Sequence, residues 1–203
     1  LPSAIKFTYN WNMRELSNVV QGLCRADPGS YTEPLDMVRL WYHECNRVFK
    51  DRMVAALDLS RFEEQLLDVG KKFFSEVKIG TGMNDIIEIK AEELVAEPCV
   101  YTSFVSPSHG EPTYLPIPSQ EVFVECVKGK LVEYNESNSI MDLVLFQAAL
   151  LHVSRIARIV ANPAGNAMLI GVGGSGKQSL SKLASFILGY ELKQISVSGR
   201  YGV

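Results

Sequence analysis

A glycine-rich run that ends in lysine, Gly171-Val172-Gly173-Gly174-Ser175-Gly176-Lys177, restricts the fold of this chain more than any other feature. It fits the pattern G-x-x-x-x-G-K, in which glycines let successive backbone N–H groups point inward and surround an anion. The apolar residues 167–172 are typical of a buried parallel strand, and residues 179–188 carry the apolar stripe of an amphipathic helix. A second apolar segment, 192–197, follows them. Strand, glycine loop, helix and strand in this order predict the opening of an α/β nucleotide-binding fold.

The side chains of the run suit a phosphate group. Lys177 supplies a positive charge for the β- and γ-phosphates of a nucleotide, and Ser175 offers a hydroxyl or an N–H group. The N-terminus of the following helix carries positive partial charge and favours an anion. The predicted nucleotide-binding residues are Gly171, Gly173, Gly174, Ser175, Gly176, Lys177, Gln178 and Ser179.

One position departs from the pattern. After its lysine a P-loop normally carries Ser or Thr, whose hydroxyl holds Mg²⁺. Here Gln178 stands in that place and Ser179 follows it. Because one helical step turns a side chain by about 100°, Ser179 does not simply replace the missing hydroxyl. The amide oxygen of Gln178 is the candidate Mg²⁺ ligand, directly or through water, and the change bears on hydrolysis more than on binding.

No catalytic residue is assigned. The carboxylate pair of a Walker B strand would lie on a later strand, which we expect beyond Val203. Asp142 is interpreted as a helix cap and Glu191 as a solvated surface charge. Since the glycine run comes late in the chain, we expect this sequence to hold the start of an ATPase module without its catalytic remainder.

The first 77 residues predict a small all-helical unit of three helices. Asn12 and Glu15 have the spacing of a capping box before the first helix, and Pro34 suits the first turn of the second. Ser60 and Glu63 have the spacing of another capping box, which predicts the start of the third helix.

Residues 78–133 read as a connector with partial structure, because prolines interrupt any long helix. Within them, Cys99–Val105 could be extended. Residues 134–203 are predicted to be the N-terminal part of a larger α/β domain. A helix is expected there from Ser139 to about Val160, and Asn162-Pro163 should end it.

Composition excludes several classes of partner. The net charge of −3 gives no global field that would favour nucleic acid or acidic lipid. No apolar run approaches the roughly 18 residues that a membrane span requires. The four cysteines are scattered, without a C-x-x-C pair, so the sequence favours reduced thiols in a cytosolic protein over a zinc site. We therefore expect neither nucleic acid nor membrane as a partner.

Several long stretches resemble one family. Residues 165–180, including the unusual Lys-Gln-Ser ending, resemble the P-loop of the fourth AAA+ module of axonemal dynein heavy chains, and the preceding helix Leu143–Ile156 is similar too. Residues 7–23 look like the sensor-2 helix of the third module, and residues 40–52 like the next helix of that lid. The resemblance covers most of the chain and is weakest across 78–133.

This resemblance implies a partial AAA+ P-loop NTPase of the α/β class, preceded by a small all-α lid over residues 1–77. It implies that this region binds ATP or ADP with Mg²⁺ and regulates the ring of a minus-end-directed microtubule motor that drives ciliary and flagellar beating. The parent protein would be an ATPase, whereas we do not expect the isolated chain to be a competent hydrolase. The implied partners are other AAA+ modules of the same heavy chain, dynein intermediate and light chains, and microtubules. The implied locations are cytoplasm, cytoskeleton and axoneme.

The same match puts Arg14 at the sensor-2 position, where its guanidinium would face the nucleotide of the third module. From the helix alone, an ion pair with a neighbouring carboxylate is the alternative. Arg47 and Arg52 could reach across the module junction or form ordinary surface ion pairs.

Two other functions fit parts of the sequence. The first is an independent P-loop kinase or other NTPase, against which the 170 residues before the loop argue. The second is a non-catalytic interaction module in which the glycine run is only a turn. Charge reversal at Lys177 separates this module from a nucleotide site, because the module predicts no loss of nucleotide binding.

Overall fold

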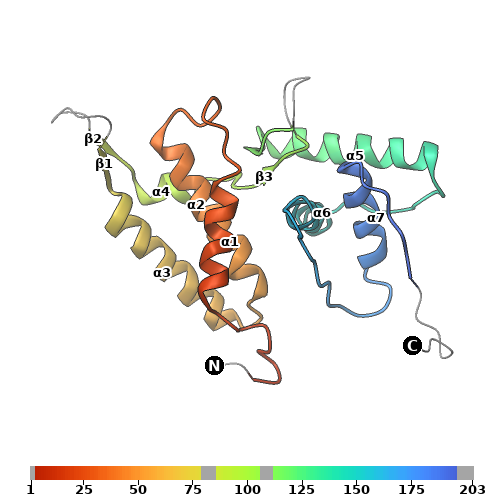
Figure 1. Cartoon of the computed structure of the whole chain (residues 1–203), viewed down its shortest axis with the longest axis horizontal. Coiled ribbons are helices and arrows are strands. Elements are labelled where there is room, and N and C mark those ends of the chain that lie inside the picture. Colours follow the sequence, from red (N-terminus) through yellow and green to blue (C-terminus); the bar gives the residue numbers. More distant parts are fainter. Residues whose placement is uncertain (1–2, 79–85, 106–111, 196–203) are drawn as a thin grey trace. The chain divides into compact units, whose positions relative to one another are not determined.

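The chain forms two compact units, residues 1–119 and residues 120–203. The computed structural model describes residues 3–78, 86–105 and 112–195. Figure 1 colours the chain along its sequence and labels its helices α1 to α7 and the strands β1 to β3. Among the helices described, none combines the length and the apolar character needed to cross a membrane.

The first unit is built around α2 (Pro34–Val48). Three helices, α1 (Met13–Leu23), α3 (Ala56–Phe74) and α4 (Ala91–Val95), each pack against it. The short 3-10 helix η1 (Lys50–Arg52) lies between α2 and α3. The predicted three-helix unit is therefore present, with α2 as its central element.

Buried side chains around α2 form three hydrophobic clusters, and α2 contributes to each. Two of the clusters also take residues that follow position 77, so the packed core of this unit extends into the predicted connector. The clusters are Val19, Cys45, Val48 and Leu66; Val38, Ile89 and Leu94; and Leu40, Tyr101 and Tyr114.

The start of α1 has the predicted capping box. The Asn12 side-chain oxygen accepts from the Arg14 backbone N–H at 2.8 Å, and Glu15 Oε2 accepts from the Asn12 backbone N–H at 2.8 Å. Pro34 occupies the first position of α2, as expected for a residue that lacks the N–H a helix start cannot use.

The start of α3 differs from the prediction. The helix begins at Ala56, more than one turn earlier than expected, and Ser60 lies inside it with its hydroxyl donating to the Leu57 carbonyl at 3.1 Å. The capping box predicted there is therefore wrong. The backbone N–H groups just before α3 find their acceptor outside the helix. The Tyr9 hydroxyl accepts from the N–H groups of Val54 and Ala55, at 3.0 and 3.3 Å.

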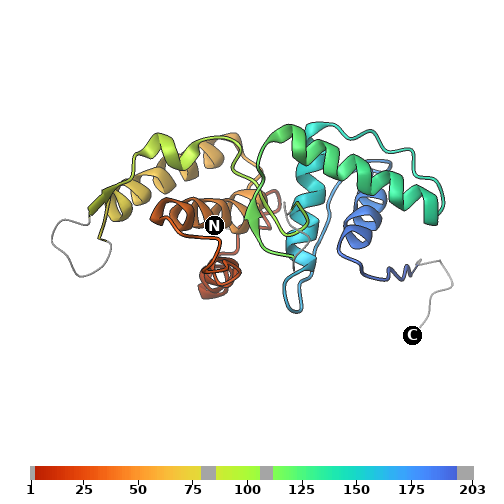
Figure 2. The ribbon, with the colours of Figure 1, turned by 90° about the horizontal axis from the view of Figure 1, so that it is seen from above.

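Two short antiparallel pairs follow α3. Strand β1 (Glu76–Lys78) pairs with β2 (Ile86–Glu88), and Figure 2 shows this pair at the end of α3. Strand β3 (Tyr101–Thr102) pairs with β4 (Leu115–Pro116). The strand β3 lies inside the segment 99–105 that was expected to be extended. Its two side chains are buried.

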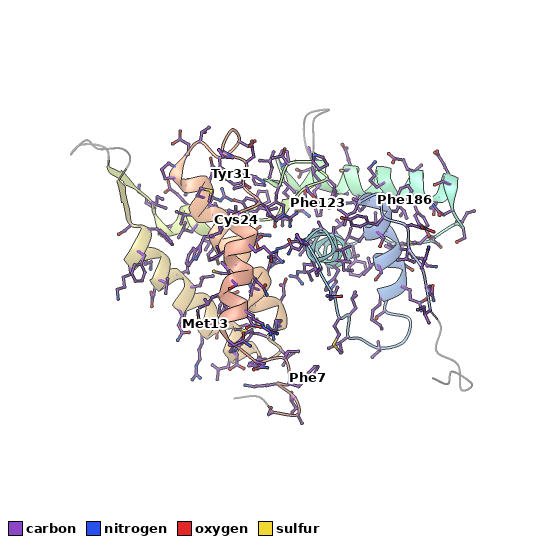
Figure 3. All side chains as sticks on the ribbon, viewed as in Figure 1. Phe7, Met13, Cys24, Tyr31, Phe123 and Phe186 are labelled. Atoms are coloured by element: carbon purple, nitrogen blue, oxygen red, sulfur yellow. The ribbon has the colours of Figure 1, made fainter. Side chains whose placement is uncertain are left out.

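The described part of the second unit holds three helices, α5 (Gln120–Ser137), α6 (Gln147–Val160) and α7 (Lys177–Ile187). Helix α7 packs against both α5 and α6. Tyr134 of α5 and Phe186 of α7 meet edge to face, with ring centroids 5.3 Å apart. Figure 3 labels Phe186 on α7 and Phe123 on α5. The boundary expected between residues 133 and 134 falls within α5, whereas the compact units divide before Gln120. Other buried apolar residues of this unit are Phe123, Val127, Ala149, Leu150, Val153, Ile156, Ala157, Leu180, Leu183 and Ala184.

Helix boundaries in this unit were predicted with mixed success. The helix expected from Ser139 begins only at Gln147, because Phe146 at its N-cap has an extended backbone with φ −84° and ψ 165°. Its end at Val160, just before Asn162-Pro163, is confirmed. Helix α7 begins at Lys177, two residues before its predicted start.

Neither predicted strand is present among the residues described. Residues 167–172 form no ladder, and Met168, Ile170 and Val172 are 81%, 63% and 79% exposed rather than buried. Residues 192–195, the described part of the second predicted strand, form no ladder either. A strand needs a neighbour that takes up its N–H and C=O groups, and no described segment pairs with these two. The prediction of a buried strand over residues 167–172 is therefore wrong, and the described part of the second predicted strand is not a strand either.

Candidate functional site: the glycine loop and the start of α7

The backbone of the loop requires its glycines. Gly174 and Gly176 have φ of +76° and +78°, in the left-handed region that only glycine adopts without strain. The Ser175 N–H donates to the Val172 carbonyl at 3.4 Å and closes a turn. A Cβ atom on Gly173, Gly174 or Gly176 would meet no other atom within 4 Å. The loop thus presents its main chain to open space, as an anion-binding loop must.

The Lys177 ammonium lies across this loop. It donates to the carbonyl oxygens of Gly171 and Val172 at 2.8 and 2.6 Å, and to Ser175 Oγ at 3.0 Å. A Cβ on Gly171 would lie 3.0 Å from Ser175 Oγ and 3.6 Å from Lys177 Nζ, so glycine leaves room for this arrangement. Within the described part of the chain, no carboxylate forms an ion pair with Lys177. Its positive charge is therefore met only by neutral oxygens.

The N-terminus of α7 adds to this positive end. Gly176 is the N-cap and provides no side-chain cap, and the first turn contains no acidic residue. The Gly176 carbonyl already accepts from the Leu180 N–H at 2.8 Å, so the helix is formed from its first residue. Helix dipole, open main chain and ammonium converge at one end of α7, which is the arrangement that binds phosphate.

The two residues after the lysine have different surroundings. The Gln178 side chain is exposed, whereas Ser179 is half-buried and lines a hollow beside α7. One step along a helix separates them, so their side chains diverge, as expected. The structure therefore brings together residues 171–177 at the loop and turns Ser179 away to a second feature.

This second feature, called the α7 hollow below, has a volume of about 240 Å³. It lies between α5, the segment 139–142 and α7. Its walls combine an aromatic ring, two hydroxyls, a lysine, an aspartate and two apolar side chains. The lining residues are Tyr134, Ser139, Ile140, Met141, Asp142, Ser179 and Lys182.

Most of these residues were not singled out from the sequence. Ser179 and Lys182 are three apart on one helix, which places them on the same face. Tyr134 could have been included had Gln120–Ser137 been recognised as a helix, since Phe123, Val127 and Tyr134 are its buried side chains. The segment 139–142 was predicted to be helical. It lines the α7 hollow as a non-helical segment instead.

Two acidic residues were given structural interpretations. Asp142 does not cap α6, whose N-cap is Phe146, and its exposed carboxylate lines the α7 hollow instead. Glu191 lies 3.7 Å from Lys193, and both side chains are about four-fifths exposed. The cap interpretation of Asp142 is therefore wrong, and the surface-charge interpretation of Glu191 is confirmed.

The arginines noted in the sequence all belong to the first unit. Arg14 lies on the first turn of α1 with an exposed side chain. Arg52 forms an ion pair with Glu15 at 2.7 Å, and Arg47 forms one with Asp51 at 3.3 Å. For Arg47 and Arg52 the structure has ion pairs within the unit.

Metal ligands are sparse in the part of the chain that the structure describes, where no group of three or more His, Cys, Asp or Glu side chains could hold an ion. Near the loop, the Gln178 amide and the Ser175 hydroxyl are oxygen ligands of the kind Mg²⁺ accepts. A Mg²⁺ ion here would take most of its oxygens from phosphate groups and water, as this ion usually does.

Comparison with known proteins agrees with this geometry. Residues 141–203 match a family described as the P-loop containing dynein motor region D4, and residues 1–82 match the AAA+ lid domain. The lid match covers α1, α2 and α3 but ends before α4, and the motor-region match covers the glycine loop and α7. The chain therefore combines an AAA+ lid with the P-loop part of an AAA+ module.

The chain is also similar to dynein heavy chains over all of its own residues. The whole chain is 51% identical to the flagellar outer-arm dynein beta chain of Chlamydomonas reinhardtii. It is 43% identical to the ciliary dynein beta chain of Tripneustes gratilla and 41% identical to dynein axonemal heavy chain 17 of Homo sapiens. It spans 4% of the length of each of these relatives. With every part of its sequence aligned to them and both matched domains of the AAA+ type, the chain belongs to the axonemal dynein heavy chain family.

Proposed function

We propose that residues 171–177 and the start of α7 bind the phosphates of ATP or ADP, with Mg²⁺, in an AAA+ module of an axonemal dynein heavy chain. The observation that carries this is the Lys177 ammonium, which lies over an open glycine loop at an uncapped helix N-terminus and meets only neutral oxygens. Charge-assisted hydrogen bonds to phosphate are roughly twice as strong as neutral ones. A phosphate therefore competes well with the loop carbonyls for this lysine.

The α7 hollow is the place for the other end of the nucleotide. Ser179 and Lys182 line it, two and five residues beyond Lys177. At a rise of about 1.5 Å per residue, they lie about 3 and 7.5 Å along the helix axis from that lysine. A volume of about 240 Å³ is small beside the roughly 300–1,000 Å³ of pockets that take whole ligands. It suits the nucleoside part of a molecule whose phosphates lie at the loop.

We propose binding and regulation, rather than hydrolysis, as the role of this chain's own residues. Gln178 replaces the hydroxyl that normally holds Mg²⁺, and we expect its amide to reach the ion directly or through water. The general base and the metal carboxylates remain assigned to a later strand of the module. Within the whole ring, the site would bind nucleotide and tune the other modules.

The relatives' names suggest the role of the parent protein. They describe flagellar, ciliary and axonemal dynein chains. By this likeness we propose that the whole protein is a minus-end-directed microtubule motor ATPase of the axoneme. Its partners would be microtubules, dynein intermediate and light chains, and the other AAA+ modules of the same chain. An independent kinase is disfavoured, because the whole chain aligns with dynein heavy chains and residues 141–203 match a dynein motor region.

The first unit would serve the preceding module. We propose that it is the lid of the third module and that Arg14 is its sensor-2 arginine, since that side chain is exposed at the start of α1. The domain limits proposed from the sequence, 1–77, 78–133 and 134–203, accompany this assignment. The packed core of the lid also uses Ile89, Leu94, Tyr101 and Tyr114.

The test is photolabelling of the full-length protein with 8-azido-ATP, followed by peptide mapping, which separates this site from any other nucleotide site. We expect labelled peptides from residues 134–188 in the wild type and loss of that label in Lys177→Ala and Lys177→Glu. Lys193→Ala is the matched control, because it removes a lysine that is 82% exposed and remote in sequence from the loop. Equal labelling of wild type and both Lys177 variants would reduce the glycine run to a structural turn.

A further inference from the structure

The segment that walls the α7 hollow is held by one side chain of α5. Asn135 Oδ1 accepts from the Met141 backbone N–H at 2.8 Å, and Asn135 Nδ2 donates to the Met141 carbonyl at 3.3 Å. One amide thus pairs with both polar groups of a single residue, as a neighbouring strand would. The orientation of the Asn135 amide is determined by this contact, since the Met141 N–H requires an acceptor.

Little else described in the structure fixes this segment. The Ile140 and Val144 side chains are 85% and 75% exposed, so they provide no packing anchor. The Met141 carbonyl also accepts from the Leu143 N–H at 3.2 Å, a contact that is local to the segment. The Asn135 side chain is therefore the tie between residues 139–142 and the helical framework that carries α7.

We propose that Asn135 is a positioning residue for the nucleoside end of the bound nucleotide. This inference rests on the function proposed above. Asn135 does not touch the phosphates; it holds Met141, and with it Ser139, Ile140 and Asp142, at the mouth of the hollow. The phosphate loop 171–177 is built without it. Loss of the Asn135 amide should therefore weaken recognition of the nucleoside and leave recognition of the phosphates intact.

The readout is the affinity for ATP relative to inorganic tripolyphosphate, which carries the phosphates without a nucleoside. In the full-length protein, each compound competes with sub-saturating 8-azido-ATP for the label mapped to residues 134–188. For Asn135→Ala we expect the half-inhibitory concentration of ATP to rise about tenfold, which corresponds to the loss of one to two hydrogen bonds. The value for tripolyphosphate should not change.

Asn138→Ala is the matched control. This asparagine lies at the same end of α5, and its side chain bonds the Tyr134 carbonyl and Ser137 Oγ instead of Met141. In Asn138→Ala, the half-inhibitory concentrations of ATP and of tripolyphosphate should equal those of the wild type. Amide hydrogen exchange of the peptide around Met141 provides a second measurement, and it should become faster in Asn135→Ala alone.

Each outcome decides the matter. A rise for ATP alone, with faster exchange at Met141, supports the positioning role. If the half-inhibitory concentrations of ATP and tripolyphosphate rise equally, Asn135 acts on the folding of the whole unit. If neither rises, the pairing of Asn135 with Met141 is irrelevant to binding. Both results overturn the inference. If the wild type itself shows no competition, and Lys177→Ala labels equally, the proposed nucleotide site fails first and the inference fails with it.

Discussion

The Tyr114 hydroxyl donates a 2.8 Å hydrogen bond to Oε1 of Glu44, which lies 70 residues earlier in the chain. The Glu44 side chain is completely buried. Tyr114 precedes strand β4 and Glu44 lies on α2. The bond therefore ties the region after residue 99 to the central helix of the lid. A buried charge needs such partners, because its desolvation is costly.

Tyr114→Phe should lower the free energy of unfolding by about 1.5–3 kcal/mol, the usual range for a hydrogen bond to a charged group. The ring and its packing remain, so the loss isolates the hydroxyl. Urea unfolding of the chain measures it. Tyr190→Phe is the control, since Tyr190 is 52% exposed and its hydroxyl should contribute little. Equal stability of the two variants would mean that Glu44 is satisfied without Tyr114.

Gly22→Ala should destabilise the lid even though alanine is the better helix former. A Cβ on Gly22 would lie 1.9 Å from Glu44 Oε2 and 2.3 Å from its Cδ, and that carboxylate is fixed by burial. Overpacking of this kind costs about 1–3 kcal/mol. Denaturant unfolding should show a lower midpoint with an unchanged slope.

Gly129→Ala provides the matched comparison for that experiment. Gly129 lies within α5, and a Cβ there would meet no atom within 4 Å. Alanine should raise stability by about 0.5–1 kcal/mol, because it reduces the backbone entropy of the unfolded chain. If both substitutions stabilise, the close approach of α1 to α2 at Gly22 is incorrect.

Glu15→Gln should reduce stability at neutral pH and flatten its loss in acid. The hydrogen bond from Arg52 lowers the pKa of the Glu15 carboxyl below its ordinary value, against the opposing effect of burial, and the Asn12 N–H lowers it further. A lowered pKa in the folded state gives stability that is present above the unfolded value, about 4.3, and is lost as pH falls through the folded value. Because Arg52 is about one-third exposed, we expect only about 1–2 kcal/mol.

Thermal unfolding between pH 7 and pH 2.5 checks this expectation. Wild type and Glu15→Gln should converge at the acid end, where Glu15 is protonated in both states. Glu63→Gln serves as control, since the Lys50–Glu63 pair is more exposed and should contribute little at any pH. A constant difference between wild type and Glu15→Gln across the range would contradict the role of the carboxylate charge.

Local chemistry was what the sequence could predict. The cap of α1 by Asn12 and Glu15, the entry of Pro34 into α2 and the stop of α6 before Pro163 each depend on neighbours a few residues apart. The glycine loop could also be predicted from local sequence, because the positive φ values of Gly174 and Gly176 require glycine at those two positions alone.

Long-range partners account for the errors. The start of α3 depends on the Tyr9 hydroxyl, some 45 residues earlier. The non-helical segment before α6 is a separate case, because the Asn135 amide that pairs with Met141 is local in sequence and no repeating pattern marks such a contact. Residues 167–172 have the composition of a buried strand, but burial and pairing require a neighbouring strand that composition does not supply. For the same reason the α7 hollow could not be foreseen, because it exists only where α5, residues 139–142 and α7 meet.

Gln178→Thr should increase the dependence of nucleotide binding on Mg²⁺ at this site. Gln178 is the second residue of α7 and its side chain is exposed, so threonine fits without steric conflict. A hydroxyl at this position is the usual ligand of phosphate-bound Mg²⁺. Site-resolved 8-azido-ATP labelling, titrated with Mg²⁺ and repeated with EDTA, gives the dependence. Gln147→Thr is the control, because it makes the same change at the exposed first residue of α6. Identical Mg²⁺ curves for wild type and both variants would place residue 178 away from the metal, and the ion would then be held by phosphate and water alone.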